Sequence, residues 1–178
     1  MLITVGHGTA AQPELIALLR GAAVRRLVDI RRFPGSRAHP HVGREALARW
    51  LPDAGVEYRW EQRLGGRRRL PDDSPDVWWQ VPAFRAYAAH MRTPEFLDAV
   101  AELVTDAGPA CTAVMCSESL WWRCHRRLLA DHLVLVRDLP VQHLDHRGGL
   151  SDHRVSAGAR LTAGNGIVYD AAPGSGTT

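Results

Sequence analysis

The sequence predicts an α/β fold, a three-layer sandwich around a mostly parallel, Rossmann-like sheet. Short apolar runs alternate along the chain with stretches of helical periodicity. The connections between successive runs are long enough to hold a helix, as parallel strands require. Polar residues gather directly after several apolar runs, and open α/β sheets carry their chemistry at that edge.

The first strand is expected at residues 2–6, and it ends in Gly6 and His7. A helix is expected from residue 13, so the chain opens with the first part of a βαβ unit. The turn lacks a complete G-x-G-x-x-G pattern, and we therefore expect no nicotinamide or flavin cofactor. His7 is a candidate catalytic base or donor, although a histidine that caps the strand fits equally well.

The second strand is expected over residues 26–31, where Asp29 interrupts an apolar run. A carboxylate at this place must be paired or must face a wet site, because burying it alone is costly. Asp29 is therefore either a catalytic carboxylate at the sheet edge or the structural partner of a neighbouring arginine. Arg31, and Arg37 in the loop that follows, are candidate anion-binding groups.

A helix at residues 44–51 and a third strand at residues 56–60 are expected to lead into the basic turn Gly65-Gly66-Arg67. Two glycines allow a backbone to approach a ligand closely. Consecutive arginines suit phosphate neutralisation. A solvated basic turn without a ligand is the alternative.

Residues 83–106 are expected to form two helices, because Thr93 and Pro94 make a typical N-cap and first helical position. Tyr87 lies on the apolar face of the first helix. Core packing is the usual role of such a face, but Tyr87 could also reach a pocket.

The central stretch of the chain is a strand expected at residues 112–115, which delivers Cys116 and Glu118 at its end. A helix is expected over residues 124–135. A strand, a polar loop and a helix N-terminus together can bind an anion through free backbone N–H groups. Four further candidates lie in this stretch: Trp122, Cys124, His125 and Arg126.

Five motifs in this sequence resemble, in order, those of a bacterial family called domain of unknown function 488. They are Thr4-Val5-Gly6-His7, the run from Leu27 to Arg37, Leu64-Gly65-Gly66-Arg67-Arg68, the run from Phe84 to Met91, and Cys116-x-Glu118 with Trp122-x-Cys124-His125-Arg126. The resemblance extends from residue 2 to about residue 145. It implies the fold more directly than the function, because the family name assigns no activity.

One α/β domain is expected over residues 1–148. The remainder, residues 149–178, is expected to be a poorly ordered tail, because its composition turns to glycine, serine, alanine and threonine. No apolar run approaches the roughly 20 residues of a membrane span. The start lacks the basic flank of a signal peptide. We therefore expect a cytoplasmic protein without membrane contact.

The basic residues are all arginine, since the sequence has 22 lysines and arginines together and contains no lysine. Arginine suits forked contacts with phosphate and stacking on bases. The formal net charge of +3 permits a nucleic acid, DNA first, or a nucleotide as partner. A coding bias towards arginine is the plain alternative.

The cysteines lie at positions 111, 116 and 124, an odd and closely spaced set that does not indicate a disulfide framework. Cys116, Cys124 and His125 include the ligand types that zinc prefers. However, no CxxC pair is present, and adjacent residues at the start of a helix cannot easily reach one ion. We therefore expect no metal.

The leading functional hypothesis is a DNA glycosylase or related N-glycosidase that hydrolyses an N-glycosidic bond without metal. Asp29 or Glu118 would supply the carboxylate, and His7 or His125 the proton donor. The expected phosphate contacts are Arg31, Arg37, Arg67 and Arg126, and the other candidate substrate contacts are Gly6, Gly65, Gly66, Tyr87, Cys116, Trp122 and Cys124.

Two alternatives come from other classes of protein. A thiol-dependent enzyme is the first, because Cys116 ends a strand and faces a helix N-terminus that carries arginines. Leu27-Val28-Asp29-Ile30-Arg31 resembles the V-D-V-R strand of rhodanese-like sulfur transferases, which makes this alternative rhodanese-like. A module that binds a nucleotide or nucleic acid without turnover is the second, since a dense polar site alone does not demonstrate catalysis.

Overall fold

The computed structural model describes residues 1–108, 110–164 and 166–170. Its centre is a six-stranded sheet with the order β3-β2-β4-β1-β5-β6. The first five strands pair in parallel and β6 is antiparallel to β5. The strands are β1 (Leu2–Gly6), β2 (Arg26–Asp29), β3 (Glu57–Trp60), β4 (Thr112–Cys116), β5 (Val141–Leu144) and β6 (Leu150–Asp152). The predicted mostly parallel sheet is therefore confirmed.

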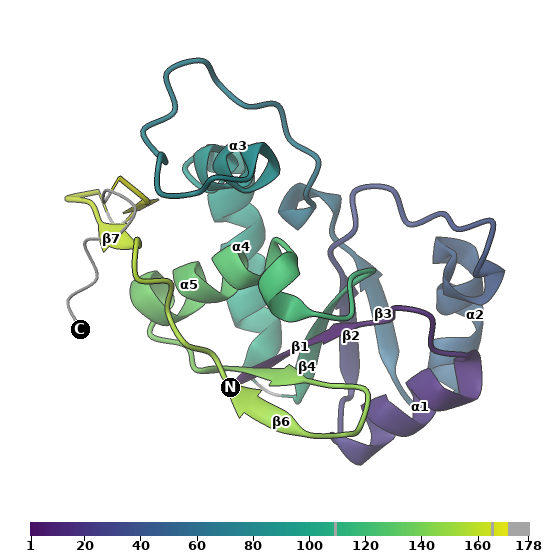
Figure 1. Cartoon of the computed structure of the whole chain (residues 1–178). Coiled ribbons are helices and arrows are strands. Elements are labelled where there is room, and N and C mark those ends of the chain that lie inside the picture. Colours follow the sequence, from purple (N-terminus) through teal and green to yellow (C-terminus); the bar gives the residue numbers. More distant parts are fainter. Residues whose placement is uncertain (109, 165, 171–178) are drawn as a thin grey trace.

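Helices cover both faces of this sheet and make the three predicted layers (Figure 1). The α-helices are α1 (Gln12–Gly21), α2 (Arg44–Asp53), α3 (Pro82–His90), α4 (Pro94–Ala107) and α5 (Arg126–Arg137). The predicted cap of α4 is also present, since the Thr93 hydroxyl accepts a hydrogen bond from the Phe96 N–H. None of the helices in the described ranges is long and apolar enough to cross a membrane.

Two separate apolar clusters lie on the two faces of the sheet, because alternate residues of a strand point in opposite directions. Ile3 packs on one face with Leu15 of α1 and Leu47 of α2. Leu2 packs on the other face with Phe96 of α4 and other residues of the α3–α5 layer. Burying each of these side chains contributes about 1.5–3 kcal/mol, so the helices are held to the sheet from both sides.

The chain order of the strands brings three loops to one edge. β4 lies between β2 and β1 although it follows them in sequence. The C-terminal ends of β1, β2 and β4 are therefore neighbours; His7 and Arg31 follow β1 and β2, and Cys116 is the last residue of β4. In open α/β sheets ligands bind in the crevice outside these ends.

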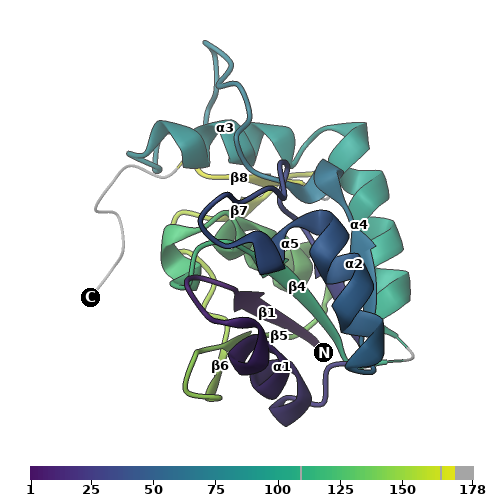
Figure 2. The same ribbon diagram turned by 90° about the vertical axis from the view of Figure 1, so that its right-hand side faces the viewer.

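The C-terminal segment differs from the poorly ordered tail that the sequence predicts for residues 149–178. It adds β6 to the sheet and forms a second, antiparallel pair, β7 (Arg160–Leu161) with β8 (Ile167–Val168). This pair lies beside α3 in both ribbon views (Figures 1 and 2). Residues 165 and 171–178, which belong to the same prediction, lie outside the described residues.

Two buried carboxylates explain the order of this segment. Tyr169 is fully buried, its hydroxyl donates to Asp131 at 2.7 Å, and its N–H donates to Asp76 at 3.0 Å. Asp76 also accepts two hydrogen bonds from Arg92. Buried carboxylates must be satisfied, and a composition rich in small residues does not reveal that the segment supplies these donors.

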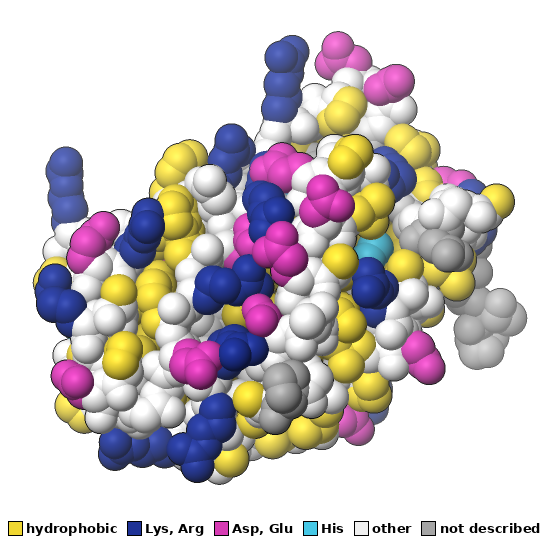
Figure 3. Space-filling view, turned by 180° about the vertical axis from the view of Figure 1, so that it is seen from behind, with side chains coloured by type: hydrophobic (Ala, Val, Ile, Leu, Met, Phe, Trp, Pro, Cys, Tyr) yellow, Lys and Arg dark blue, Asp and Glu magenta, His cyan; other side chains and the backbone are white. Residues whose placement is uncertain are grey.

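Arginines and acidic side chains are interleaved on the face opposite to that of Figure 1 (Figure 3). Arg26, Arg59 and Arg63, here called the paired arginines, each lie within 3.3 Å of carboxylate oxygens. Their partners are Glu57, Glu61, Glu102 and Asp106. These charges are satisfied within the protein.

Candidate functional site

A cavity of about 380 Å³ opens at the C-terminal ends of β1, β2 and β4. It is lined by His7, Gly8, Arg31, Arg32, Phe33, Gly35, Ser36, His39, Gly66, Arg67, Cys116, Ser117 and His125. Among these described residues there are three arginines and three histidines, and there is no aspartate or glutamate. A cavity of this composition favours an anionic ligand.

Cys116 ends β4 and presents its sulfur to this cavity, although its side chain is almost buried. A hydrogen bond from the Cys124 thiol, together with the positive surroundings of His125 and Arg126, holds the pKa of Cys116 well below its usual value. Burial of the Cys124 thiol and its hydrogen bond to Cys116 raise the pKa of Cys124. These opposite directions favour Cys116 over Cys124 as the thiolate of the pair.

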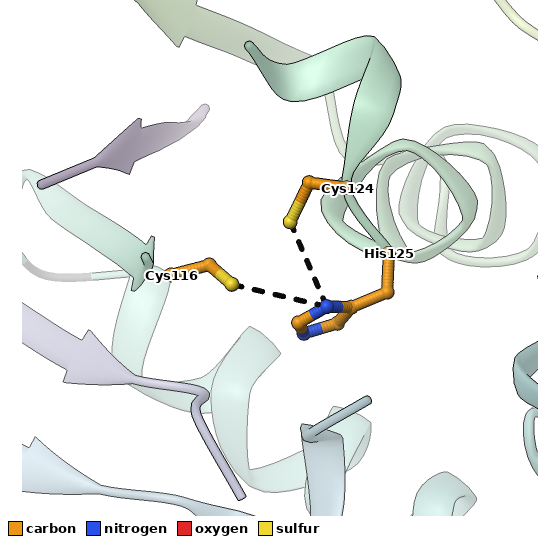
Figure 4. A group of neighbouring side chains, drawn as sticks. All are labelled: Cys116, Cys124 and His125. Carbon is orange, nitrogen blue, oxygen red and sulfur yellow. Dashed lines mark hydrogen bonds between the residues drawn. The ribbon is translucent and has the colours of Figure 1, made fainter. Parts of the chain in front are cut away.

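The side chains of Cys116, Cys124 and His125 converge on one point (Figure 4). The His125 Nδ1 atom lies 3.6 Å from the Cys124 sulfur and 3.9 Å from the Cys116 sulfur. The argument that two adjacent residues of a helix cannot reach one point is wrong here. Cys124 is extended, with φ −126° and ψ 152°, and α5 begins only at Arg126, so Cys124 and His125 turn to the same side.

These three side chains include the ligand types of a zinc site with three protein ligands. A histidine that binds a metal normally donates its other ring N–H to an acceptor, which fixes the ring. The His125 Nε2 atom is buried and has no hydrogen-bond partner within the part of the chain that the structure describes. Among the described residues His125 therefore lacks the acceptor that normally orients a metal-bound histidine.

Arg126 is buried and lies under the loop that follows Cys116 instead of pointing at a ligand. Its guanidinium donates to the carbonyl oxygens of Glu118 and Ser119. A Cβ at Gly6 would overlap the Glu118 carbonyl, so the close approach of β1 to this loop requires glycine. Gly6 and Arg126, predicted as substrate contacts, instead hold the loop in place.

A buried chain of hydrogen bonds supports Arg126 from below. Asp131 contacts His153 at 2.8 Å, His153 contacts His143 at 2.9 Å, and His143 contacts the Thr4 hydroxyl at 2.6 Å. The Thr4 hydroxyl in turn lies 3.5 Å from Arg126. Burial first, and then the charges of His153 and Arg126, lower the pKa of His143 to about 3, so His143 is neutral at physiological pH.

Asp29 is fully buried and does not line the cavity. Its two oxygens accept hydrogen bonds from Arg31 at 2.8 and 2.6 Å, and the Tyr58 hydroxyl donates to it at 2.9 Å. This is the structural role that the sequence left open for Asp29, and it differs from the predicted catalytic one. The pair fixes the Arg31 guanidinium at the cavity wall.

His7 is neutral and orients Arg31 from the other side. Burial, and next the charge of Arg31, lower the pKa of His7 to about 4. Its Nδ1 lies 2.9 Å from the Gly8 carbonyl oxygen, which requires the proton on Nδ1. The Nε2 atom is then an acceptor and lies 3.1 Å from Arg31. His7 lines the cavity as predicted, beside Cys116.

The predicted basic turn also forms part of the cavity wall. Arg67 has φ +58°, a backbone conformation that is uncommon for residues other than glycine. Its carbonyl accepts a hydrogen bond from Arg32 at 2.7 Å. A Cβ at Gly65 would lie 2.7 Å from the Arg32 nitrogen, so only glycine lets the two loops pack. Gly66 lies against the His125 ring.

Several other predicted site residues lie away from the cavity. Glu118 is exposed, and its carboxylate accepts from the Leu120 N–H. Arg37 and Trp122 are exposed but do not line the cavity. Tyr87 is buried behind His125, with ring centres 4.9 Å apart, and donates to the Leu64 carbonyl. Tyr87 therefore supports His125 from within the core.

Seven residues that line the cavity are not among the predicted site residues: Gly8, Arg32, Phe33, Gly35, Ser36, His39 and Ser117. Most of them belong to the loop directly after β2. The signal that could have identified them is the position of this loop, since it follows a central parallel strand and carries Arg31, Arg32 and Arg37.

The fold and the site define an α/β protein with a cationic cavity that presents a cysteine at the C-terminal edge of its sheet. The chain belongs to the family described as Domain of unknown function DUF488, whose model matches residues 12–133. This match confirms the resemblance that the sequence motifs indicate. Neither the curated proteins nor the solved structures include a match to this chain.

Proposed function

We propose that this protein is a thiol-dependent sulfurtransferase that takes sulfane sulfur from a small anionic donor onto Cys116. One observation carries the proposal. The Cys116 thiolate faces a cavity lined by arginines, and that cavity contains no acidic residue within the described chain. This function corresponds to the rhodanese-like alternative rather than to the leading hypothesis from sequence.

Groups outside the cavity lining stabilise the negative charge of the Cys116 thiolate. A thiolate is the reactive form of cysteine, and nearby positive groups and hydrogen-bond donors stabilise it. Cys116 has such a donor in Cys124 and such a charge in Arg126, which forms no ion pair within the described residues. The buried charge of Arg126 therefore adds to the groups that favour the thiolate form of Cys116.

Arg32 and Arg67 supply the free positive charge for the substrate. The charge of Arg31 is matched by Asp29, whereas Arg32 and Arg67 form no ion pair within the described part of the chain. Both line the cavity with Cys116. An oxyanion bound between them would be held close to the sulfur, as nucleophilic catalysis requires.

The lining contains histidines but no carboxylic acid among the described residues, which favours sulfur transfer, a step without proton transfer, over phosphate ester hydrolysis. A phosphate ester releases an alcohol, and a general acid normally protonates that leaving group. In sulfur transfer from thiosulfate, the Cys116 thiolate attacks the outer sulfur and the S–S bond breaks. Cys116–S⁻ and S₂O₃²⁻ become Cys116–S–S⁻ and SO₃²⁻, and the departing sulfite takes its electron pair without a proton.

The N-glycosidase hypothesis stays a prediction, and its geometry is less favourable. It requires a carboxylate beside the substrate. The Asp29 carboxylate is fully buried and bound to Arg31, and the Glu118 carboxylate is exposed and does not line the cavity. Nucleic-acid binding without turnover also stays a prediction. Abasic products from damaged oligonucleotides would support the first, and salt-sensitive binding alone the second.

The test is a sulfurtransferase assay with thiosulfate or methanethiosulfonate as donor and cyanide as acceptor, followed by thiocyanate formation. We expect turnover by the natural protein and none by Cys116→Ser. Cys111→Ser is the matched control, because Cys111 lies at the other end of β4 and contacts the Ala22 carbonyl. Equal turnover by the natural protein and Cys116→Ser would contradict the proposal.

A further inference from the structure

The second cysteine of the site has a position that the sulfur-transfer step does not use. The Cys124 sulfur lies within 4.8 Å of the Cys116 sulfur, but Cys124 is only 4% exposed and does not line the cavity. It can therefore reach whatever is bonded to Cys116 and cannot easily reach a substrate in the cavity. A thiol behind a reactive cysteine is placed to react with the covalent intermediate.

We infer that Cys124 is a resolving thiol, which attacks the Cys116 persulfide, closes a Cys116–Cys124 disulfide and releases the transferred sulfur as hydrosulfide. This inference rests on the proposed function, since it requires sulfur on Cys116. The resolving step means that the site reduces sulfane sulfur. Its product is then hydrosulfide, and no persulfide is passed to a large acceptor.

The step balances in atoms and electrons. The Cys124 sulfur attacks the Cys116 sulfur, the new S–S bond forms, and the bond between Cys116 and the outer sulfur breaks. The outer sulfur leaves with its electron pair and takes the Cys124 proton, so Cys116–S–S⁻ and Cys124–SH become the disulfide and HS⁻. The sulfane sulfur is reduced and the two cysteines are oxidised.

His125 lies beside both sulfurs of this step. Its Nδ1 atom is 3.6 Å from the Cys124 sulfur, which loses the proton, and 3.9 Å from the Cys116 sulfur, which is attacked (Figure 4). Tyr87 and Gly66 pack against the ring and hold it in this position. The Cys124 and Cys116 sulfurs lie within 4.8 Å of each other, so the attacking sulfur and its target are neighbours before the reaction.

The resulting disulfide must be reduced before a second turnover. A small dithiol, or a protein with a reactive dithiol, is the class of reductant that exchanges with such a bond. The reductant would reach the disulfide at Cys116, the member of the pair that lines the cavity. A dithiol reductant is therefore the second substrate of the cycle.

A single-turnover experiment tests the inference. Fully reduced protein, without acceptor and without air, receives a slight excess of methanethiosulfonate. Hydrosulfide is measured by its bimane adduct, and the state of each cysteine by alkylation and peptide mass. We expect about one equivalent of hydrosulfide and a Cys116–Cys124 disulfide. Cys124→Ser should release the sulfinate but hold a persulfide on Cys116, with at least about ten-fold less hydrosulfide.

The controls separate this inference from the proposed function. Cys111→Ser should behave as the natural protein does. A natural protein that keeps the persulfide on Cys116 while Cys124 is still free to alkylate would overturn the resolving role alone. Failure of Cys116 to gain sulfur in both the natural protein and Cys124→Ser would overturn the proposed function as well. Zinc bound stoichiometrically in the purified protein, with both thiols blocked, would also overturn the inference.

The natural protein is informative even if Cys124→Ser does not fold. Circular dichroism and thermal unfolding should be recorded for that variant, and Cys124→Ala is a second replacement that leaves no hydroxyl in the apolar cluster around Cys124. The disulfide and the hydrosulfide are both measured on the unmodified chain, so their absence there contradicts the resolving role directly.

Discussion

The paired arginines and the arginines of the cavity have the same side chain in opposite surroundings. Arg59 and Arg63 share the carboxylates of Glu61 and Glu102 within 3.3 Å. Arg32 and Arg67 line a cavity without any acidic residue in the described chain. The difference indicates which arginines are available to a ligand, and a count of arginines alone cannot.

Arg31 shows how the two kinds of arginine are combined at one site. It faces the cavity, yet Asp29 holds it with two hydrogen bonds and His7 contacts it from the other side. A guanidinium fixed in this way loses little conformational freedom when an anion binds. The cavity thus has one rigid arginine and two whose charge is not matched.

The largest effect on activity is expected when the nucleophile of the cavity, Cys116, is replaced. Cys116→Ser should lower kcat/KM for sulfur transfer by at least about a thousand-fold, because a serine hydroxyl is not ionised near neutral pH. Thiocyanate formation measures the effect, and circular dichroism verifies the fold. A loss of less than about ten-fold would mean that another group attacks the donor.

The second largest effect is expected on stability, when the buried partner of a cavity arginine is removed. Asp29→Asn should lower the free energy of unfolding by about 3–5 kcal/mol, because it leaves the buried Arg31 charge uncompensated. Urea denaturation followed by fluorescence measures it. A loss below about 1 kcal/mol would show that Asp29 is not needed to hold Arg31.

A smaller effect is expected when one unmatched charge is removed from the cavity. Arg67→Asn should lower kcat/KM about ten-fold, which corresponds to about 1.4 kcal/mol, mainly through a higher KM for the anionic donor. Asparagine tolerates the left-handed backbone of this position. The matched variant Arg63→Asn should leave KM unchanged, and equal effects of the two variants would contradict the distinction.

The smallest effect is expected at an exposed partner of the paired arginines. Glu102→Gln should shift the midpoint of urea denaturation far less than Asp29→Asn does, because exposed ion pairs contribute little and Glu61 still serves both arginines. The same urea denaturation measures it. A loss comparable with that of Asp29→Asn would remove the contrast between buried and exposed partners.

The sheet could be predicted from sequence because each strand is apolar and is separated from the next by helical periodicity. The same logic predicted that His7, Arg31 and Cys116 meet at one edge, since parallel strands share their C-terminal ends. What could not be predicted was the direction in which charged side chains turn. Arg126 points inward and donates to two carbonyl oxygens, whereas the Glu118 side chain is exposed. The close packing of β1 against this loop determines both directions.

The convergence of Cys124 and His125 was also hidden from sequence. A helix that began at Cys124 would separate the two side chains, but the extended backbone there and the later start of α5 bring them together. The order of the C-terminal segment was missed for a similar reason. Its donors satisfy Asp131 and Asp76, which are distant in sequence, and composition carries no information on such contacts.

The measurement that tests the central proposal most directly is the alkylation rate of Cys116 against pH, with iodoacetamide and with iodoacetate. Because the pKa of Cys116 lies well below its usual value, the thiolate persists as pH falls until that lowered pKa is reached. We therefore expect rates that are already maximal at neutral pH, and a preference for the anionic iodoacetate over the neutral reagent relative to a free thiol. A rate that rises through the ordinary cysteine range near pH 8.5, together with slower reaction of iodoacetate, would contradict a thiolate in an anion-binding cavity.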